Sequence, residues 1–249
     1  MKTISNKIFF DITSEFYDEM INFDLSLQRK KGAFNKIVPS KTKYVADLGC
    51  GSGIDSIALS ELGYNVTAFD ISEGMIEKAK KNAEEKKQII KFNKYSIDKI
   101  PSSFNNQFDF VCSLGNTFAN LNKTELKKSI ERIIDLLNEN GSFLIHIINY
   151  KKILLEKNRI LNITNKKENY YVRFYDFEKN HINFNILNFN KDNPNTNNLI
   201  TTKLYPHTCR DFEHTLKQKG FGNFKFYSSM NKKPFDSELS KDMFIYGRK

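Results

Sequence analysis

The chain has 249 residues, of which 39% are hydrophobic and 27% are charged, proportions typical of a folded globular protein. No apolar run approaches the roughly 20 residues that a membrane-spanning helix needs. Residues 1–13 lack the apolar core and small-residue cleavage site of a signal peptide. Composition therefore argues against a disordered, membrane-embedded or secreted protein.

The formal net charge of +10 raises the question of a nucleic-acid partner. The excess is mostly lysine, and asparagine, isoleucine and phenylalanine are also abundant, a bias typical of A- and T-rich coding sequences. Arginine, which reads phosphate groups with two parallel hydrogen bonds, is scarce. We therefore expect a small-molecule partner, which the positive charge allows to be anionic, and we disfavour nucleic acid.

The three cysteines, Cys50, Cys112 and Cys209, lie far apart in the chain and include no CxxC pair. Disulfide frameworks use even numbers of cysteines, and structural zinc sites use closely spaced pairs. We expect three reduced thiols in a cytoplasmic protein, and no metal site.

Residues 10–38 carry apolar side chains at helical spacing and end at Pro39, which predicts an N-terminal helical segment. Strands and helices then alternate as far as residue 148. Strands are expected at residues 43–48, 65–70, 88–96, 108–114 and 142–148, and helices at residues 54–62, 72–87 and 122–141. Asn122 and Glu125 have the spacing of a capping box at the start of the last helix. Such alternation implies right-handed crossovers and a parallel sheet covered by helices on both faces.

Residues 151–205 break this alternation. Strand-like runs at residues 170–177, 181–189 and 198–205 follow one another with no predicted helix between them. We interpret this region as an antiparallel β flap, inserted after the fifth strand, that covers a substrate.

Thr208 and Asp211 have the spacing of a second capping box, at the start of a helix that Gly220 closes. Residues 221–229 and 242–249 predict two final strands, close enough in the chain to pair antiparallel. The expected fold class is α/β, with a mostly parallel sheet closed by an antiparallel C-terminal hairpin.

We expect a single domain over residues 1–249. Within it, residues 1–40 would form a helical cap and residues 151–205 the substrate-covering β insertion.

The segment ADLGCGSG, residues 46–53, places three glycines directly after the first predicted strand. This turn falls at the carboxyl edge of the sheet, where open α/β sheets bind their ligands. Gly49, Gly51 and Gly53 form GxGxG, but Ile54 stands where the dinucleotide fingerprint GxGxxG has its third glycine. No Lys-Ser/Thr pair follows, as it would in a phosphate-binding P-loop. We therefore expect the loop to let a ligand other than a dinucleotide approach the backbone closely.

Together with Asp70 and the stretch LGNTFANL at residues 114–121, this loop resembles the class I S-adenosylmethionine (SAM)-dependent methyltransferases. The order of elements is similar to that family over nearly the whole chain, and the likeness is greatest to the glycine/sarcosine N-methyltransferase type. The resemblance implies a Rossmann-like, seven-stranded sheet, SAM as methyl donor and S-adenosylhomocysteine as product. It also implies a transferase acting on a small-molecule acceptor.

The resemblance also assigns residues to SAM. Asp47 would face the methionyl amino group, and Asp70, at the end of the second strand, would accept hydrogen bonds from both ribose hydroxyls. The N-terminus of the helix after Gly53 would favour the carboxylate of the ligand. Ser96 and Ile97 would border the adenine. The full expected set is Asp47, Gly49, Gly51, Gly53, Asp70, Ile71, Ser96, Ile97 and Leu114.

On the acceptor side the resemblance points to Asn116, Asn120, Asn149 and Tyr150. Glycine-methylating relatives hold the acceptor carboxylate with an arginine just before the Asn-Tyr pair, where this chain has Ile148. An unpaired carboxylate in a closed pocket is costly, so Ile148 argues against glycine as the acceptor. Those relatives also carry a histidine where this chain has Asn120. The reaction is therefore expected, but the acceptor is left open.

Two residues are candidates for a catalytic role. Tyr17 falls where similar enzymes cover the donor methyl with an N-terminal helix, although an aromatic residue in a helix core would fit the same pattern. A hydroxyl acceptor needs a base, for which His207 is the first candidate. An amine or a phosphate-type oxygen needs none. The basic surplus favours an anionic acceptor, such as a phosphate-bearing or nucleotide-linked metabolite.

Three other functions remain open at this stage. An RNA methyltransferase would share the fold, but the Asn/Asp-Pro-Pro-aromatic turn of many base-amine methylating relatives is absent after the fourth strand. An NAD-dependent oxidoreductase would need room for a pyrophosphate. A non-catalytic SAM-binding protein would keep the fold without transferring a methyl group.

Overall fold

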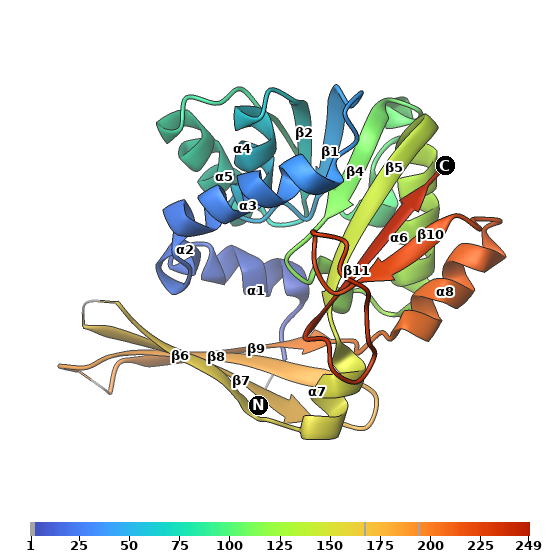
Figure 1. Cartoon of the computed structure of the whole chain (residues 1–249). Helices are drawn as coiled ribbons and strands as arrows, with labels where there is room; N and C mark the ends of the chain where they lie inside the picture. The colour runs from blue at the N-terminus through green and yellow to red at the C-terminus, as the bar shows by residue number, and fades with distance from the viewer. Residues whose placement is uncertain (1–2, 167, 194) are drawn as a thin grey trace.

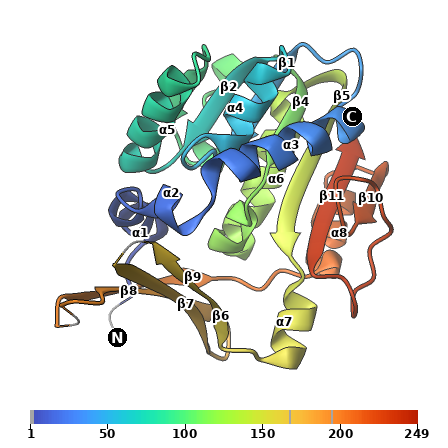
Figure 2. The ribbon, with the colours of Figure 1, turned by 60° about the vertical axis from the view of Figure 1, so that its left-hand side comes forward.

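The computed structural model describes residues 3–166, 168–193 and 195–249. Their strands form a seven-stranded sheet and a separate four-stranded sheet, which Figures 1 and 2 show from two sides. The larger sheet contains β1 (Tyr44–Leu48), β2 (Asn65–Asp70), β3 (Lys91–Lys94), β4 (Phe108–Ser113), β5 (Leu137–Ile148), β10 (Phe224–Tyr227) and β11 (Asp242–Arg248).

The strand order of the larger sheet is β10-β11-β5-β4-β1-β2-β3. The pairs among β1 to β5 are parallel, whereas β11 runs antiparallel to both of its neighbours, β5 and β10. The chain therefore reverses direction only at β11 within this sheet. The predicted fold class, a mostly parallel seven-stranded sheet closed by an antiparallel pair, is confirmed.

Eight α-helices occur in the described part of the chain. They are α1 (Asn6–Thr13), α2 (Tyr17–Met20), α3 (Phe23–Ile37), α4 (Ile54–Glu61), α5 (Glu73–Glu85), α6 (Lys123–Leu136), α7 (Tyr150–Glu156) and α8 (Cys209–Gln218). The capping box predicted for α6 is present, since the Asn122 amide donates to the Glu125 carboxylate at 2.7 Å and the Glu125 amide donates back to Asn122 Oδ1 at 3.1 Å. At α8 the Thr208 amide donates to Asp211 Oδ2 at 2.8 Å. None of the described helices is both long and apolar enough to cross a membrane.

The structure corrects two predicted boundaries. The helical segment expected at residues 10–38 is divided into α1, α2 and α3, with breaks around residues 14–16 and 21–22. The helix expected to run to Gly141 ends at Leu136, because Leu137 already pairs with Phe108 in the sheet. In both cases apolar spacing continues past the point where the backbone changes direction.

The four-stranded sheet is the predicted antiparallel flap. It contains β6 (Ile160–Lys166), β7 (Asn169–Phe177), β8 (Ile182–Asn190) and β9 (Asn197–Leu204), with every neighbouring pair antiparallel. β6 and α7 were not predicted from the sequence. Figures 1 and 2 show the flap across the carboxyl edge of the larger sheet, with α1 between the two sheets. The N-terminal segment is joined to β9, since the Ile4 amide donates to the Thr201 carbonyl at 3.0 Å.

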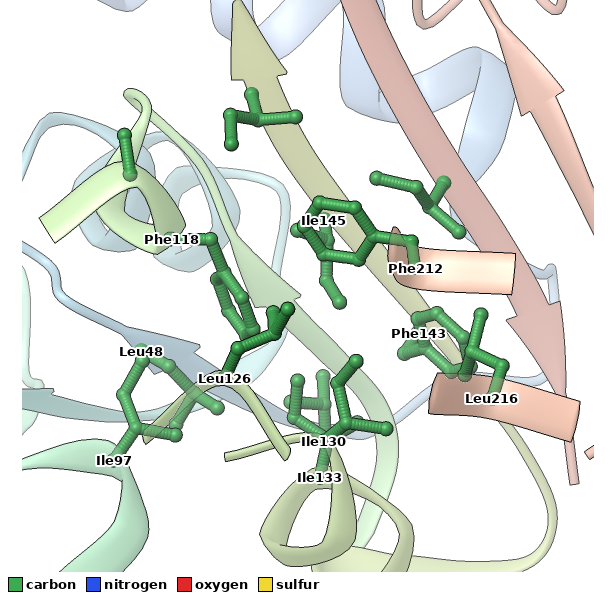
Figure 3. Packing of buried hydrophobic residues seen from close by; sticks show 14 of the residues in the cluster. Leu48, Ile97, Phe118, Leu126, Ile130, Ile133, Phe143, Ile145, Phe212 and Leu216 are labelled. Atoms are coloured by element: carbon green, nitrogen blue, oxygen red, sulfur yellow. The ribbon is translucent and has the colours of Figure 1, made fainter. Parts of the chain in front are cut away.

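Both faces of the larger sheet are covered by apolar side chains. On one face, Ile130, Ile133 and Leu216 from α6 and α8 pack against Phe143 and Ile145 of β5 in one buried cluster (Figure 3). A second buried cluster joins α3 and α4 to the sheet and includes Phe34, Ile57 and Phe110. The loops at the carboxyl edge are thereby held on a rigid base.

Candidate functional site

The glycine loop between β1 and α4 is shaped by two backbone requirements. Gly49 has φ +71°, and a Cβ there would lie 2.4 Å from Thr117 Cγ2, so a larger residue would collide with the turn after β4. Gly51 has φ +53°, and a Cβ there would meet nothing within 4 Å. Gly49 thus lets two loops touch, while Gly51 leaves open space above the loop for a ligand.

Asp70 at the end of β2 holds this loop in place. Its Oδ2 accepts the Gly51 amide at 2.8 Å and its Oδ1 accepts the Ser72 amide at 2.9 Å. The side chain is buried, and burial raises the pKa of the Asp70 carboxyl although the backbone amides of Ser72, Gly51 and Ile71 oppose the rise. A carboxylate offers about four acceptor positions, so acceptor capacity remains for a ligand hydroxyl.

A cavity of about 730 Å³ opens at this carboxyl edge, a volume in the range of small-molecule sites. Its wall is formed by the glycine loop, the ends of β2 and β4, the segment after β3, the N-terminal residues and the end of β9. The predicted residues that line it are Tyr17, Gly49, Gly51, Asp70, Ile71, Ser96, Ile97, Leu114 and Asn120.

Unpartnered polar atoms in the wall indicate that a polar ligand belongs there. Ser52 Oγ and Asn120 Oδ1 are buried, and neither has a hydrogen-bond partner among the described residues. Ile71, Ile97 and Leu114 supply apolar surface in the same wall. A ligand with a nucleoside and an amino-acid end would contact both kinds of surface, so the residues present fit SAM.

The N-terminal helices form the other side of the cavity. Asp11 of α1 accepts the Ser72 hydroxyl at 2.6 Å and the Gly74 amide at 3.2 Å, which docks α1 on the start of α5. Phe10 and Tyr17 line the cavity from this side. Burial raises the pKa of the Tyr17 phenol, so it stays protonated at neutral pH.

Asp47 lies beneath the loop rather than in the cavity wall. It is 1% exposed, its Oδ2 accepts the Ser56 hydroxyl at 2.5 Å, and its Oδ1 is 3.8 Å from Cys112 Sγ. Burial, reinforced by the neighbouring charge of Asp55, raises the pKa of the Asp47 carboxyl to about 7. Gly53 is likewise outside the described lining and stands at the N-cap of α4.

The structure brings two of the predicted acceptor residues together. Asn116 Nδ2 donates to the Tyr150 hydroxyl at 2.9 Å, and Asn116 Oδ1 accepts the Ile148 amide at 3.0 Å. The Tyr150 hydroxyl also forms a hydrogen bond with Tyr175 of the flap. These polar groups connect the ends of β4 and β5 with β7, although Asn116 and Tyr150 are not in the described cavity lining.

Asn149 and His207 are placed differently. The Asn149 side-chain Nδ2 donates to the carbonyls of Ser237 and Ser240, at 3.0 and 2.9 Å, and so fixes a loop before β11. His207 is 3% exposed, and its Nε2 donates to the Leu121 carbonyl at 2.6 Å. Burial lowers the pKa of His207. Neither side chain is in the described lining, and for His207 only Nδ1 is left to accept a proton.

Sequence reasoning missed several residues of the wall. Asp98 accepts the Ser96 hydroxyl at 2.8 Å and lies beside the predicted adenine-binding residues. The N-terminal residues and the end of β9 are joined, since the Thr202 hydroxyl donates to Asn6 Oδ1 at 2.5 Å. No local pattern marks contacts between residues 6 and 202. The missed lining residues include Thr3, Ile4, Ser5, Asn6, Lys7, Asp98, Thr202, Lys203 and Tyr205.

The sheet order, the glycine loop and the acidic end of β2 define the class I SAM-dependent methyltransferase fold. Residues 45–141 match the family model described as a methyltransferase domain. They span β1 to the start of β5, including the glycine loop and Asp70.

Two groups of curated relatives are similar to part of this chain. Human glycine N-methyltransferase is 32% identical over 124 residues, which cover 44% of this chain and 42% of the relative. Glycine/sarcosine N-methyltransferase of Aphanothece halophytica is 31% identical over 144 residues, covering 57% of this chain and 54% of the relative. The chain thus matches about half the length of these relatives.

Solved structures share the fold over almost the whole chain. A SAM-dependent methyltransferase from Clostridium acetobutylicum has a TM-score of 0.78 at 18% identity, covering 96% of this chain and 98% of its own. The CcbJ methyltransferase of Streptomyces caelestis has a TM-score of 0.79 at 14% identity, with 95% and 96% covered. SAM-bound CalS10 of Micromonospora echinaspora, an amino pentose methyltransferase, has a TM-score of 0.65 at 9% identity and is covered completely. The flap and the N-terminal helices therefore belong to an architecture found in other proteins.

Proposed function

We propose that the protein is an enzyme that transfers a methyl group from SAM to a nitrogen or oxygen atom of a small polar metabolite. The observation that carries the proposal is the cavity at which Gly51, the buried Asp70 carboxylate and Tyr17 meet. SAM would supply a methyl group on a sulfonium, which reacts by in-line displacement. The protein contributes orientation, for which about 7–11 kcal/mol of the barrier is available.

In this proposal SAM is bound by the glycine loop, Asp70 and the segment after β3. The charge of Asp47, beneath the loop, attracts the methionyl amino group. Tyr17 covers the donor methyl from the N-terminal side. The proposed acceptor-binding residues include Asn116 and Tyr150, which are hydrogen-bonded to each other. Asn120 and Asn149 complete the proposed acceptor set.

For the acceptor we propose an anionic compound, such as a phosphate-bearing or nucleotide-linked metabolite. The net charge of +10 supports this choice, as do Lys99 and Lys203, which line the cavity and form no ion pair with a described residue. Lys7 and Lys30 also line it, but they are paired with Asp11 and Asp55. The curated relatives are named for glycine and sarcosine, which are therefore further nitrogen acceptors to test. Free Cys50, Cys112 and Cys209 support a reducing, cytoplasmic compartment.

The proposal is tested by incubating the full chain with SAM carrying a labelled methyl group. One reaction contains a low-molecular-weight metabolite extract and a second contains total RNA. We expect label in the small-molecule fraction. Label in RNA would favour an RNA methyltransferase, and SAM binding without transfer would favour a non-catalytic SAM-binding protein. The absence of SAM binding in calorimetry would overturn the proposal.

The His207→Gln variant then tests whether a hydroxyl acceptor uses His207 as its base. Glutamine can keep the donor to the Leu121 carbonyl but cannot take up a proton. If the acceptor is a hydroxyl and His207 is the base, transfer falls by about 10²–10⁴-fold while SAM binding is unchanged. With an amine acceptor, transfer by the variant stays close to that of the unmodified protein.

A further inference from the structure

One side chain of the cavity wall carries a hydrogen-bond acceptor that nothing in the described chain satisfies. Asn120 ends the short 3₁₀ helix η3 (Thr117–Asn120) after β4 and lines the cavity. Its Oδ1 is buried and has no hydrogen-bond partner among the described residues. Buried amide oxygens are rarely left without a partner, because removing them from water is costly. A molecule bound in the cavity is therefore the expected source of the missing donor.

The orientation of the Asn120 amide is fixed by its other end. Asn120 Nδ2 donates to the Thr117 carbonyl at 3.1 Å. Only the nitrogen of an amide side chain can donate to a carbonyl, so this bond assigns the nitrogen and the oxygen. A half-turn of the amide would place Oδ1 against that carbonyl, and two acceptors would then face each other. Oδ1 therefore remains free to accept a hydrogen bond from a ligand.

The N-terminal segment and the end of β9 hold Asn120 in place. Its backbone carbonyl accepts Asn6 Nδ2 at 2.7 Å, and Asn6 Oδ1 accepts the Thr202 hydroxyl at 2.5 Å. The carbonyl of Ala119 accepts the Tyr205 amide at 2.6 Å. Asn6, Thr202 and Tyr205 also line the cavity. Asn120 thus lies where η3, the N-terminal segment and the flap meet, and these contacts keep its side chain in the cavity wall.

Resting on the proposed function, we propose that Asn120 Oδ1 accepts a hydrogen bond from an N–H or O–H group of the methyl acceptor. In that function the donor groups of SAM have other partners, since the ribose hydroxyls are assigned to Asp70, the methionyl amino group to Asp47 and the adenine to the segment after β3. An ionised carboxylate or phosphate oxygen cannot donate to a carbonyl oxygen, so the anionic end of the acceptor lies elsewhere in the cavity. Asn120 therefore selects acceptors that present an amine or a hydroxyl group to η3.

The test measures binding of three monovalent cations to the full chain saturated with S-adenosylhomocysteine. Ethylammonium offers only N–H donors, choline offers only an O–H donor, and tetramethylammonium offers neither. Each chloride salt is titrated at constant ionic strength, and dissociation constants are taken from the shift of thermal unfolding. Affinity is expressed relative to tetramethylammonium, so that the effect of the positive charge cancels.

Two variants of Asn120 separate the oxygen from the rest of the amide. Asn120→Leu and Asn120→Asp both lose the donor to the Thr117 carbonyl, but only Asn120→Asp keeps an oxygen in place of Oδ1. Asn158→Leu is the matched control, because Asn158 is an exposed asparagine outside the described lining. Calorimetry with S-adenosylhomocysteine verifies the donor site in each variant.

We expect Asn120→Leu to lower the relative affinity for ethylammonium, choline or both by about fivefold or more, the effect of losing one hydrogen bond. Asn120→Asp and Asn158→Leu should keep that affinity, and the affinity for S-adenosylhomocysteine, within about twofold. A larger loss with ethylammonium identifies an N–H group on the acceptor, and a larger loss with choline identifies an O–H group.

Four results would overturn the inference. They are an unchanged relative affinity in Asn120→Leu, an equal loss in Asn120→Asp or Asn158→Leu, weaker S-adenosylhomocysteine binding in Asn120→Leu, and no preference of the unmodified protein for either probe over tetramethylammonium. Failure of the unmodified protein to bind S-adenosylhomocysteine would instead contradict the proposed function.

Discussion

At the scale of single residues, Asp70 has two tasks that depend on one carboxylate. It fixes the glycine loop by accepting the amides of Gly51 and Ser72, and it presents the remaining lone pairs to the cavity. Burial makes the ionised form costly, and hydrogen-bond donors offset that cost. A ligand with two hydroxyl donors would add to this compensation, which is the physical reason why an acidic residue suits the end of β2.

Replacing Asp70 by Ala should therefore weaken binding of S-adenosylhomocysteine. Each hydrogen bond to a charged group contributes on the order of 1.5–3 kcal/mol, so the loss of one or two corresponds to at least a tenfold rise in Kd. Calorimetry measures this directly. Glu73→Ala is the control, because Glu73 is a nearby surface carboxylate paired with Lys94. Unchanged affinity in Asp70→Ala would contradict the assignment.

At the scale of elements, the contact between α1 and α5 closes one side of the cavity. Gly74 lies in the first turn of α5, where a Cβ would meet Ser14 Oγ at 2.5 Å and the Asp11 carbonyl at 3.1 Å. Glycine in a helix is normally unfavourable by about 0.5–1 kcal/mol relative to alanine. At this position the lack of a side chain allows α1 to pack closely, and that contact outweighs helix propensity.

Gly74→Ala should consequently reduce the free energy of unfolding, by about 1–3 kcal/mol as in other overpacked sites. Gly32→Ala is the matched control, because Gly32 lies in α3, where a Cβ would meet nothing within 4 Å. That control should be more stable by about 0.5–1 kcal/mol. Urea unfolding measures the free energy of unfolding of both variants and so distinguishes the expected loss of stability from the expected gain. An increase in stability for Gly74→Ala would show that α1 does not press on α5.

At the scale of the whole molecule, buried carboxylates give stability an unusual dependence on pH. The pKa of Asp47 is raised to about 7 and that of Asp70 is also raised, so the folded state holds more protons than the unfolded state above pH 4. Stability from these groups is therefore present at low pH and is lost as pH rises toward 7. His207 acts in the opposite direction, because burial lowers its pKa.

Comparing the unmodified protein with Asp47→Asn isolates the contribution of Asp47 to the pH dependence of stability. Between pH 5 and 7 the free energy of unfolding of the unmodified protein should fall relative to that of the variant, by up to about 1.4 kcal/mol per pH unit. The contribution of His207 cancels in this difference. Urea unfolding at pH 5, 6, 7 and 8 gives the two curves, and parallel curves would contradict the assignment.

Much of the architecture follows from local patterns. Apolar runs predict β1, β2 and β4 because strands buried on both faces need little besides hydrophobic residues. The polar strand β6 and the short helix α7 lack such a signal, and both were missed. Helical spacing likewise continues through residues 14–22, where contacts with the rest of the fold divide the segment.

The sequence by itself determined the order of elements, the glycine loop and the acidic end of β2, because each depends on neighbouring residues and on backbone conformation. The tertiary structure alone decided what surrounds that loop. It placed Asp47 beneath the cavity, His207 against a backbone carbonyl and Tyr171 of the flap against Glu19 of α2. Contacts between residues 19 and 171, or 150 and 175, arise only when the flap docks on the N-terminal helices and the sheet edge, and no local propensity encodes that docking.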